Sequence, residues 1–99
     1  MIINKTQDGS KLTLALEGRL DSSSAPQLEG ELKANLEDIT ELIMDFAELV
    51  YLSSAGLRVI LGAQKQMNKH GKMAIVKVNE TIMDIFEVTG FTEILTIEK

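Results

Sequence analysis

The segment Glu41–Lys69 reads ELIMDFAELVYLSSAGLRVILGAQKQMNK and joins a predicted strand to the clearest predicted helix of the chain. Glu41–Phe46 is nearly continuous in apolar residues, which is typical of a central strand covered on both faces. Ser54–Lys69 carries apolar residues at helical spacing on one face, namely Leu57, Ile60, Leu61 and Met67. A buried strand followed by an amphipathic helix indicates an α/β fold with parallel strands.

Further strands and helices are predicted on both sides of this segment. Asp8-Gly9 predicts a tight hairpin turn between two short strands, because glycine adopts positive φ at little cost. The remaining strands are expected at Ile2–Thr6, Lys11–Glu17 and Lys72–Val78, the remaining helices at Ser24–Leu36 and Glu80–Thr89, and a last short strand or helical turn at Ile94–Ile97.

Several helix ends carry recognisable signals. Ser24 and Gln27 have the spacing of a capping box, in which two side chains satisfy free N–H groups at the helix start. Asn79 is placed to cap the third helix, and Gly71 and Gly90 are expected to end helices in the left-handed conformation. The order of elements predicts a single-domain α/β fold: a mixed sheet of four to five strands, opened by a hairpin, with three to four helices.

Composition narrows the classes of function. The chain of 99 residues is long enough for one domain, expected over residues 1–99. Its formal net charge of −5 disfavours direct binding to nucleic acid or to anionic membranes, because both are negatively charged. No apolar run is long enough for membrane insertion. The absence of cysteine excludes disulfides and thiol chemistry and fits a cytoplasmic location.

Patterns typical of enzymes are nearly absent. His70 is the only histidine, and it lies beside a helix end with no evident partner. The chain has neither a nucleophile elbow nor a phosphate-binding P-loop. We therefore expect no catalytic residue, no metal ligand set and no cofactor.

Two adjacent serines, Ser53 and Ser54, fall where the predicted central strand turns into the best helix. The first N–H groups of a helix have no helical partner and carry the positive end of its dipole, so a phosphate on either serine would be stabilised there. Gly56 adds little bulk, so that a large partner could approach closely. Serine is also a preferred helix cap, and capping alone would explain a serine at this place.

Three motifs in order resemble those of the STAS domain, the family of anti-sigma factor antagonists. Gly18-Arg19-Leu20-Asp21 is similar to the family's G-x-L-D after the second strand, and Leu42–Phe46 to its strand that ends in aspartate. Tyr51–Leu57, which reads YLSSAGL, is similar to the family's phosphorylation motif. The predicted order of elements agrees with a STAS-like fold over nearly the whole chain.

The resemblance implies a mechanism and a partner. The unmodified antagonist binds an anti-sigma factor, usually also a serine kinase, and so frees a sigma factor; phosphorylation of one serine ends the interaction. Alignment on Gly56-Leu57 places that serine at Ser54, with Ser53 as second choice because it stands where aspartate is common in the family. The residues expected to contact the partner are Asp21, Ser22, Ser53, Ser54, Gly56 and Arg58; Asp45 is expected to order its loop through backbone N–H groups.

Three other interpretations remain open at this level. The first is a STAS domain that is never phosphorylated, acting as a subunit of a regulatory or transport complex or as a sensor of a small ligand. The second is a phosphoaspartate receiver with Asp45 as acceptor, although the first strand lacks the acidic pair that would hold a divalent cation. The third is a hydrolase with Ser54 as nucleophile, for which no histidine is evidently near.

Overall fold

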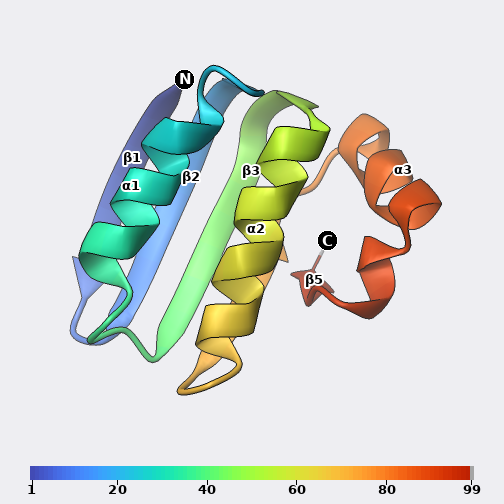
Figure 1. Cartoon of the computed structure of the whole chain (residues 1–99). Coiled ribbons are helices and arrows are strands. Elements are labelled where there is room, and N and C mark those ends of the chain that lie inside the picture. Colours follow the sequence, from blue (N-terminus) through green and yellow to red (C-terminus); the bar gives the residue numbers. More distant parts are fainter. Residues whose placement is uncertain (99) are drawn as a thin grey trace.

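The computed structural model describes residues 1–98 and contains one five-stranded sheet with order β1-β2-β3-β4-β5 (Figure 1). The hairpin strand β1 is antiparallel to β2, and the pairs β2–β3, β3–β4 and β4–β5 are parallel. The elements are β1 (Ile2–Asp8), β2 (Lys11–Leu20), α1 (Ala25–Asn35), β3 (Glu41–Leu52), α2 (Ser54–Met67), β4 (Lys72–Val76), α3 (Glu80–Thr89), a 3₁₀ turn η1 (Phe91–Glu93) and β5 (Ile97–Glu98). The predicted fold class is confirmed.

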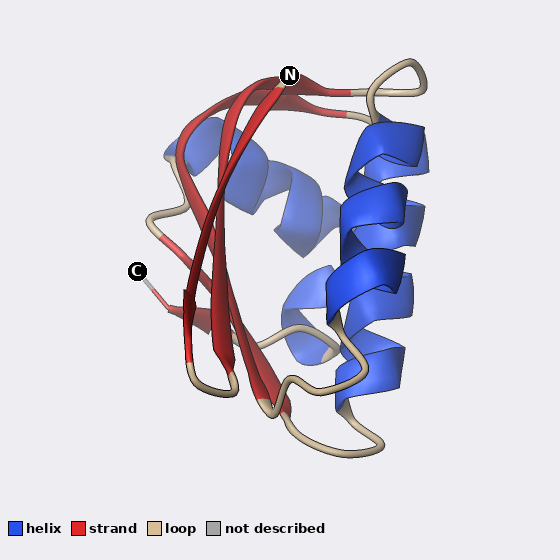
Figure 2. Ribbon diagram, turned by 90° about the vertical axis from the view of Figure 1, so that its left-hand side faces the viewer, coloured by secondary structure: helices blue, strands red, loops and turns tan. Residues whose placement is uncertain are grey.

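Helices α1 and α2 lie side by side across one face of the sheet, and α3 lies on the side of β4 and β5 (Figures 1 and 2). The core forms between this face and the helices. It is built mainly from leucines: the strands contribute Leu12, Leu14, Leu16 and Leu42, helix α1 contributes Leu28 and Leu32, and its C-cap contributes Leu36. Phe46 of β3 stacks on Phe86 of α3, with ring centroids 6.4 Å apart, and so joins α3 to the same core.

The prediction that the central strand is covered on both faces is wrong. Leu42 and Met44 are fully buried, but Ile43 between them is only half-buried. Side chains alternate along a strand, so Ile43 points to the opposite side of the sheet from Leu42 and Met44. None of the helices within residues 1–98 covers that side (Figure 2). The register partners of Ile43 are Thr13 on β2 and Ala74 on β4.

Strand β3 extends to Leu52, six residues beyond the predicted end at Phe46. The pairing with β2 shifts register twice, between Ala15 and Glu17 and between Gly18 and Arg19. Such irregularities break the two-residue alternation by which a strand is recognised in a sequence. The carboxylate of Asp45 accepts a hydrogen bond of 2.9 Å from the N–H of Ala47 at the first shift. Asp45 was expected to order a loop after the strand, but both residues lie within β3, so it binds a backbone N–H of the strand instead.

Two cap predictions are confirmed and two are wrong. Asn79 accepts a hydrogen bond from the N–H of Ile82, and Gly90 ends α3 with φ +77°. Ser24 makes no side-chain cap bond to α1, so the predicted capping box does not form. Gly71 does not adopt positive φ; a side chain there would come within 2.3 Å of the Thr40 carbonyl oxygen, so glycine is required by close packing.

The strand predicted over Lys72–Val78 ends at Val76. Lys77, the next residue, has φ +59°, a left-handed conformation that breaks the extended backbone. Its ammonium group lies 3.6 Å from the carboxylate of Asp45 on β3 and is largely exposed. Alternating valines at positions 76 and 78 give no sign of this turn.

Candidate functional site

Ser53 is the N-cap of α2, and its hydroxyl is used in the hydrogen bonding of the folded domain. Its backbone is extended (φ −96°, ψ 173°), and its hydroxyl accepts a hydrogen bond of 3.3 Å from the N–H of Gly56. Its own N–H donates to the carbonyl of Leu20 over 2.9 Å, which ties the start of α2 to the end of β2. The half-buried hydroxyl of Ser53 therefore has a structural task.

Ser54 is the first residue of α2 and is exposed. Within residues 1–98, its hydroxyl makes no hydrogen bond. It lies at the positive end of the helix dipole, next to N–H groups that have no helical partner. A phosphate on this hydroxyl would meet favourable electrostatics without displacing any existing contact.

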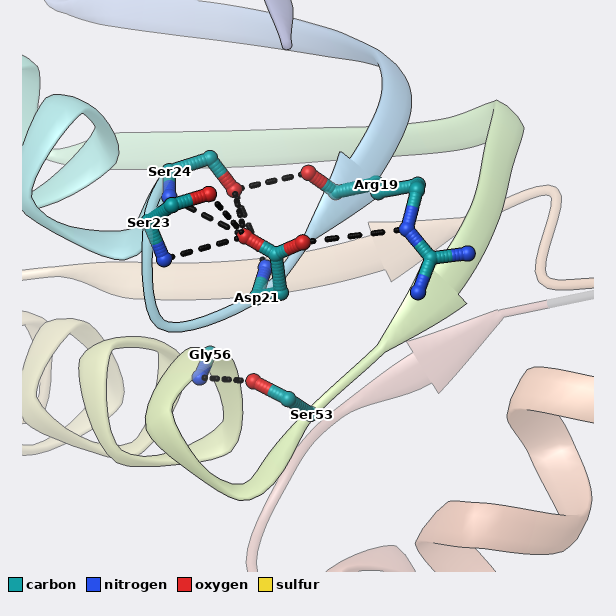
Figure 3. Close-up of polar contacts among 6 residues, drawn as sticks. All are labelled: Arg19, Asp21, Ser23, Ser24, Ser53 and Gly56. Carbon is teal, nitrogen blue, oxygen red and sulfur yellow. Dashed lines mark hydrogen bonds and ion pairs between the residues drawn. The ribbon is translucent and has the colours of Figure 1, made fainter.

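A second loop, Asp21–Ser24, lies beside the start of α2 and is held together by one carboxylate (Figure 3). Oδ1 of Asp21 accepts hydrogen bonds from the hydroxyl of Ser23 at 2.7 Å and from the N–H of Ser23 at 3.0 Å. It also accepts from the N–H of Ser24 at 3.2 Å, and at 3.2 Å it shares the proton of the Ser24 hydroxyl with the carbonyl of Arg19. These bonds, led by that from the Ser23 hydroxyl, lower the pKa of Asp21 from 3.8 to about 2.

Ser24 is buried and anchors the same loop to β2. Its hydroxyl donates to the carbonyl of Arg19 over 2.7 Å and accepts from the N–H of Asp21 over 2.9 Å. This arrangement replaces the predicted capping box, because the hydroxyl turns back to the strand instead of forward to the helix. Asp21 is thus the organiser of the loop, whereas Ser22 at its tip is exposed.

Arg19 and Tyr51 form a pair beside this loop that no motif in the sequence indicates. They are register partners on β2 and β3, and the guanidinium of Arg19 lies 4.1 Å from the centroid of the Tyr51 ring. The Nε atom of Arg19 also lies 3.7 Å from Oδ2 of Asp21. The register shift between Gly18 and Arg19 hides the pairing, so only the folded strands reveal it.

Gly56 is buried, which corrects the interpretation that its small size serves the approach of a partner. A side chain at Gly56 would lie 2.6 Å from Cγ of Leu20 and 2.8 Å from Cδ1 of Leu52. The missing side chain is therefore needed inside the domain, where α2 crosses the ends of β2 and β3.

Ser22 and Arg58 lie on opposite walls of a hollow between the starts of α1 and α2. The hollow has a volume of about 390 Å³, and both residues are exposed. It is lined by Ser22, Ala25, Pro26, Glu29, Ala55, Arg58 and Val59. The exposed residues Ser22, Ser54 and Arg58 thus share one end of the molecule, where β2 and β3 run into their helices.

Two of the open interpretations do not fit this geometry. Asp45 lies within β3, seven residues before its end, and its carboxylate is engaged by Ala47 and Lys77, so it is not placed as a phosphate acceptor at a strand end. His70 follows the far end of α2, roughly 20 Å along the helix axis from Ser54, so it cannot activate that hydroxyl.

In the part of the chain that the structure describes, no group of three or more histidine, aspartate or glutamate side chains could hold a metal ion. None of the helices within residues 1–98 combines the length and apolar character needed to cross a bilayer.

The fold and site define a small α/β domain that presents an exposed serine at the start of its central helix. The chain belongs to the STAS domain family, whose sequence model matches residues 2–99. It is 34% identical over 88 residues to BtrV of Bordetella bronchiseptica, described as a candidate anti-sigma factor antagonist; the match covers 87% of this chain and 76% of BtrV.

Solved structures agree with the fold. An anti-sigma factor antagonist from Mycobacterium paratuberculosis superposes with a TM-score of 0.88 at 18% identity, covering 97% of this chain and 83% of that one. The Bacillus antagonist SpoIIAA in its phosphorylated form superposes with a TM-score of 0.78 at 17% identity, covering 99% and 92%.

Proposed function

We propose that this protein is an anti-sigma factor antagonist controlled by phosphorylation of Ser54. Its unmodified form binds an anti-sigma factor that is also a serine kinase, and so releases a sigma factor. Phosphorylation by that kinase ends the interaction. On this proposal the protein acts in the cytoplasm by being bound and catalyses no reaction itself.

The observation that carries the proposal is the different use of two adjacent serines. Ser53 is half-buried and its hydroxyl caps α2, whereas Ser54 is exposed and its hydroxyl is free within residues 1–98. A kinase can reach the free hydroxyl without unfolding the helix start. Membership of the STAS family and the existence of a phosphorylated form of SpoIIAA, a similarly folded antagonist, support the proposal.

The charge that a phosphate adds to Ser54 favours a role for phosphorylation in switching off partner binding. A phosphate adds about −1.5 to −2 charges at pH 7. The helix dipole accepts this charge, so the domain keeps its fold. A partner surface that fits a neutral hydroxyl would have to desolvate the anion without compensating groups, at a cost of several kcal/mol.

The test is to incubate the protein with ATP and each serine-kinase anti-sigma factor encoded in the source genome, and to locate phosphate by mass spectrometry. Incorporation at Ser54 that is lost in Ser54→Ala and retained in Ser53→Ala supports the proposal. If binding occurs with no phosphate on either serine, the alternative of an unphosphorylated STAS subunit replaces it; Ser53, where aspartate is common in the family, is the feature that suggests this alternative.

A further inference from the structure

A continuous groove runs between α1 and α2, starting at the end of the domain that holds Ser54. The hollow at the helix starts is continued by a second one of about 240 Å³, and the two share Glu29, Arg58 and Val59. The groove extends from Ala55 to Gln66, which is roughly 17 Å along the axis of α2. It is therefore long enough to take several residues of another chain.

Gly62 lines the second hollow and has no evident task inside the domain. It lies in the interior of α2, it is exposed, and a side chain built on it would meet nothing within 4 Å. Its φ is not positive, so the backbone does not require glycine. Glycine in a helix interior lowers helix stability relative to alanine. Nothing inside the domain requires glycine at this position, and the missing side chain leaves the groove open for the close approach of another chain.

The charges along the groove indicate what a partner must carry. Glu29 is paired with Lys33 at 3.2 Å. Arg58, on the wall shared by both hollows, is exposed and has no carboxylate within ion-pair distance among residues 1–98. The half-buried side chains of Ala55 and Val59 offer apolar contact on either side of it. A complementary segment carries apolar side chains and a carboxylate opposite Arg58.

We propose that this groove binds a segment of the anti-sigma factor, with apolar side chains over Val59 and Gly62 and a carboxylate paired with Arg58. This inference rests on the proposed function, because the mouth of the groove at Ala55 adjoins Ser54 and a kinase that reaches the Ser54 hydroxyl is already there. The groove then gives the partner a second contact area, separate from the serine that is modified.

The test compares two glycines. Gly30 lies in the interior of α1, is exposed, and has open space where a side chain would go, as Gly62 has, but it does not line the groove. Gly62→Gln should fill the groove and weaken binding of the unphosphorylated protein to its anti-sigma factor by about tenfold or more, as expected for a blocked central contact. Gly30→Gln should leave the affinity within about twofold of the wild type, because it lies outside the contact. Titration calorimetry gives the affinities, and thermal melting shows that both variants fold.

A variant that reverses the charge of Arg58 gives an independent second test of the groove. Arg58→Glu should weaken binding by about tenfold or more, because it opposes the partner's carboxylate. If the wild type binds and Gly62→Gln and Arg58→Glu bind as tightly, or if Gly62→Gln and Gly30→Gln weaken binding equally, the groove is not the contact and the proposed function stands alone. If the wild type binds no serine-kinase anti-sigma factor, the proposed function fails, and the groove proposal fails with it.

Discussion

At the scale of single residues, the adjacent hydroxyls of Ser53 and Ser54 face different demands. The former accepts a hydrogen bond from the N–H of Gly56, and the latter is exposed. The common preference for serine at helix caps explains Ser53 and leaves Ser54 without a structural reason. Helix-cap preference in the sequence does not assign the two roles, because one residue of uncertainty in the helix boundary exchanges them; only the alignment on Gly56-Leu57 favoured Ser54.

Stability measurements on the two alanine variants test this division. Ser53→Ala should lower the free energy of unfolding by about 1 kcal/mol, because the N–H of Gly56 loses its acceptor. Ser54→Ala should change it by less than about 0.5 kcal/mol, as for an exposed residue without partners. Urea denaturation followed by circular dichroism gives both values. The reverse order would mean that Ser54, and not Ser53, caps the helix.

The Asp21 carboxylate gives a pH-dependent prediction. Its pKa is lowered to about 2 by the hydroxyl and N–H groups of Ser23 and Ser24, so the ionised form is favoured in the folded state. Its contribution to stability is present above pH ~4, the pKa in the unfolded chain, and is lost as the pH falls toward 2.

Asp21→Asn should therefore melt at a lower temperature than the wild type at pH 6, and the difference should shrink as the pH is lowered from about 4 to 2. Thermal melting at several pH values measures it. Asp38→Asn, in an exposed turn after α1, is the control for removing one surface charge. A difference between Asp21→Asn and wild type that stays constant down to pH 2 would contradict the role given to the Asp21–Ser24 loop.

At the scale of elements, two glycines of helix α2 have different surroundings. Gly56 and Gly62 lie in the same helix, six residues apart, yet only Gly56 faces a crowded neighbour. Sequence patterns treat both as helix-weakening residues. The difference depends on where α2 crosses Leu20 and Leu52, which are the ends of two strands whose register shifts the sequence does not reveal.

Alanine at the two positions should have opposite effects. Gly56→Ala should destabilise the domain by about 1–3 kcal/mol, because the new methyl group overlaps Leu20 and Leu52. Gly62→Ala should stabilise it by about 0.5–1 kcal/mol, because the helix gains propensity and meets no obstacle. Chemical denaturation of the two variants measures both changes in the free energy of unfolding. Stabilisation by Gly56→Ala would contradict the packing described for that position.

The elements show which sequence signals are dependable. Local signals predicted the Asp8-Gly9 hairpin, the Asn79 cap and the Gly90 stop, because each depends on neighbours within a few residues. The predictions failed where distant residues decide. The carbonyl of Arg19 captures the hydroxyl of Ser24, and the end of β3 is set by its pairing with β2.

At the scale of the whole molecule, one face of the sheet carries both helices that form the candidate site, and no helix of residues 1–98 lies on the opposite face (Figure 2). The parallel β2 and β3 bring their carboxyl ends to one edge, so the Asp21 loop and the start of α2 meet there although they are more than 30 residues apart. The resemblance to the STAS domain had grouped Asp21, Ser22 and Ser54 only as expected partner contacts. The pair of Arg19 and Tyr51 could not be predicted, because it depends on the exact register.

The central claim is that phosphate on Ser54 ends partner binding without disturbing the fold. The most direct measurement is calorimetric titration of one serine-kinase anti-sigma factor with the unmodified protein and with protein phosphorylated at Ser54, each also melted thermally. We predict that phosphorylation weakens binding by at least about tenfold, equivalent to 1.4 kcal/mol, while the melting temperature changes little. Equal affinity of the two forms, or weaker binding accompanied by unfolding, would contradict the account.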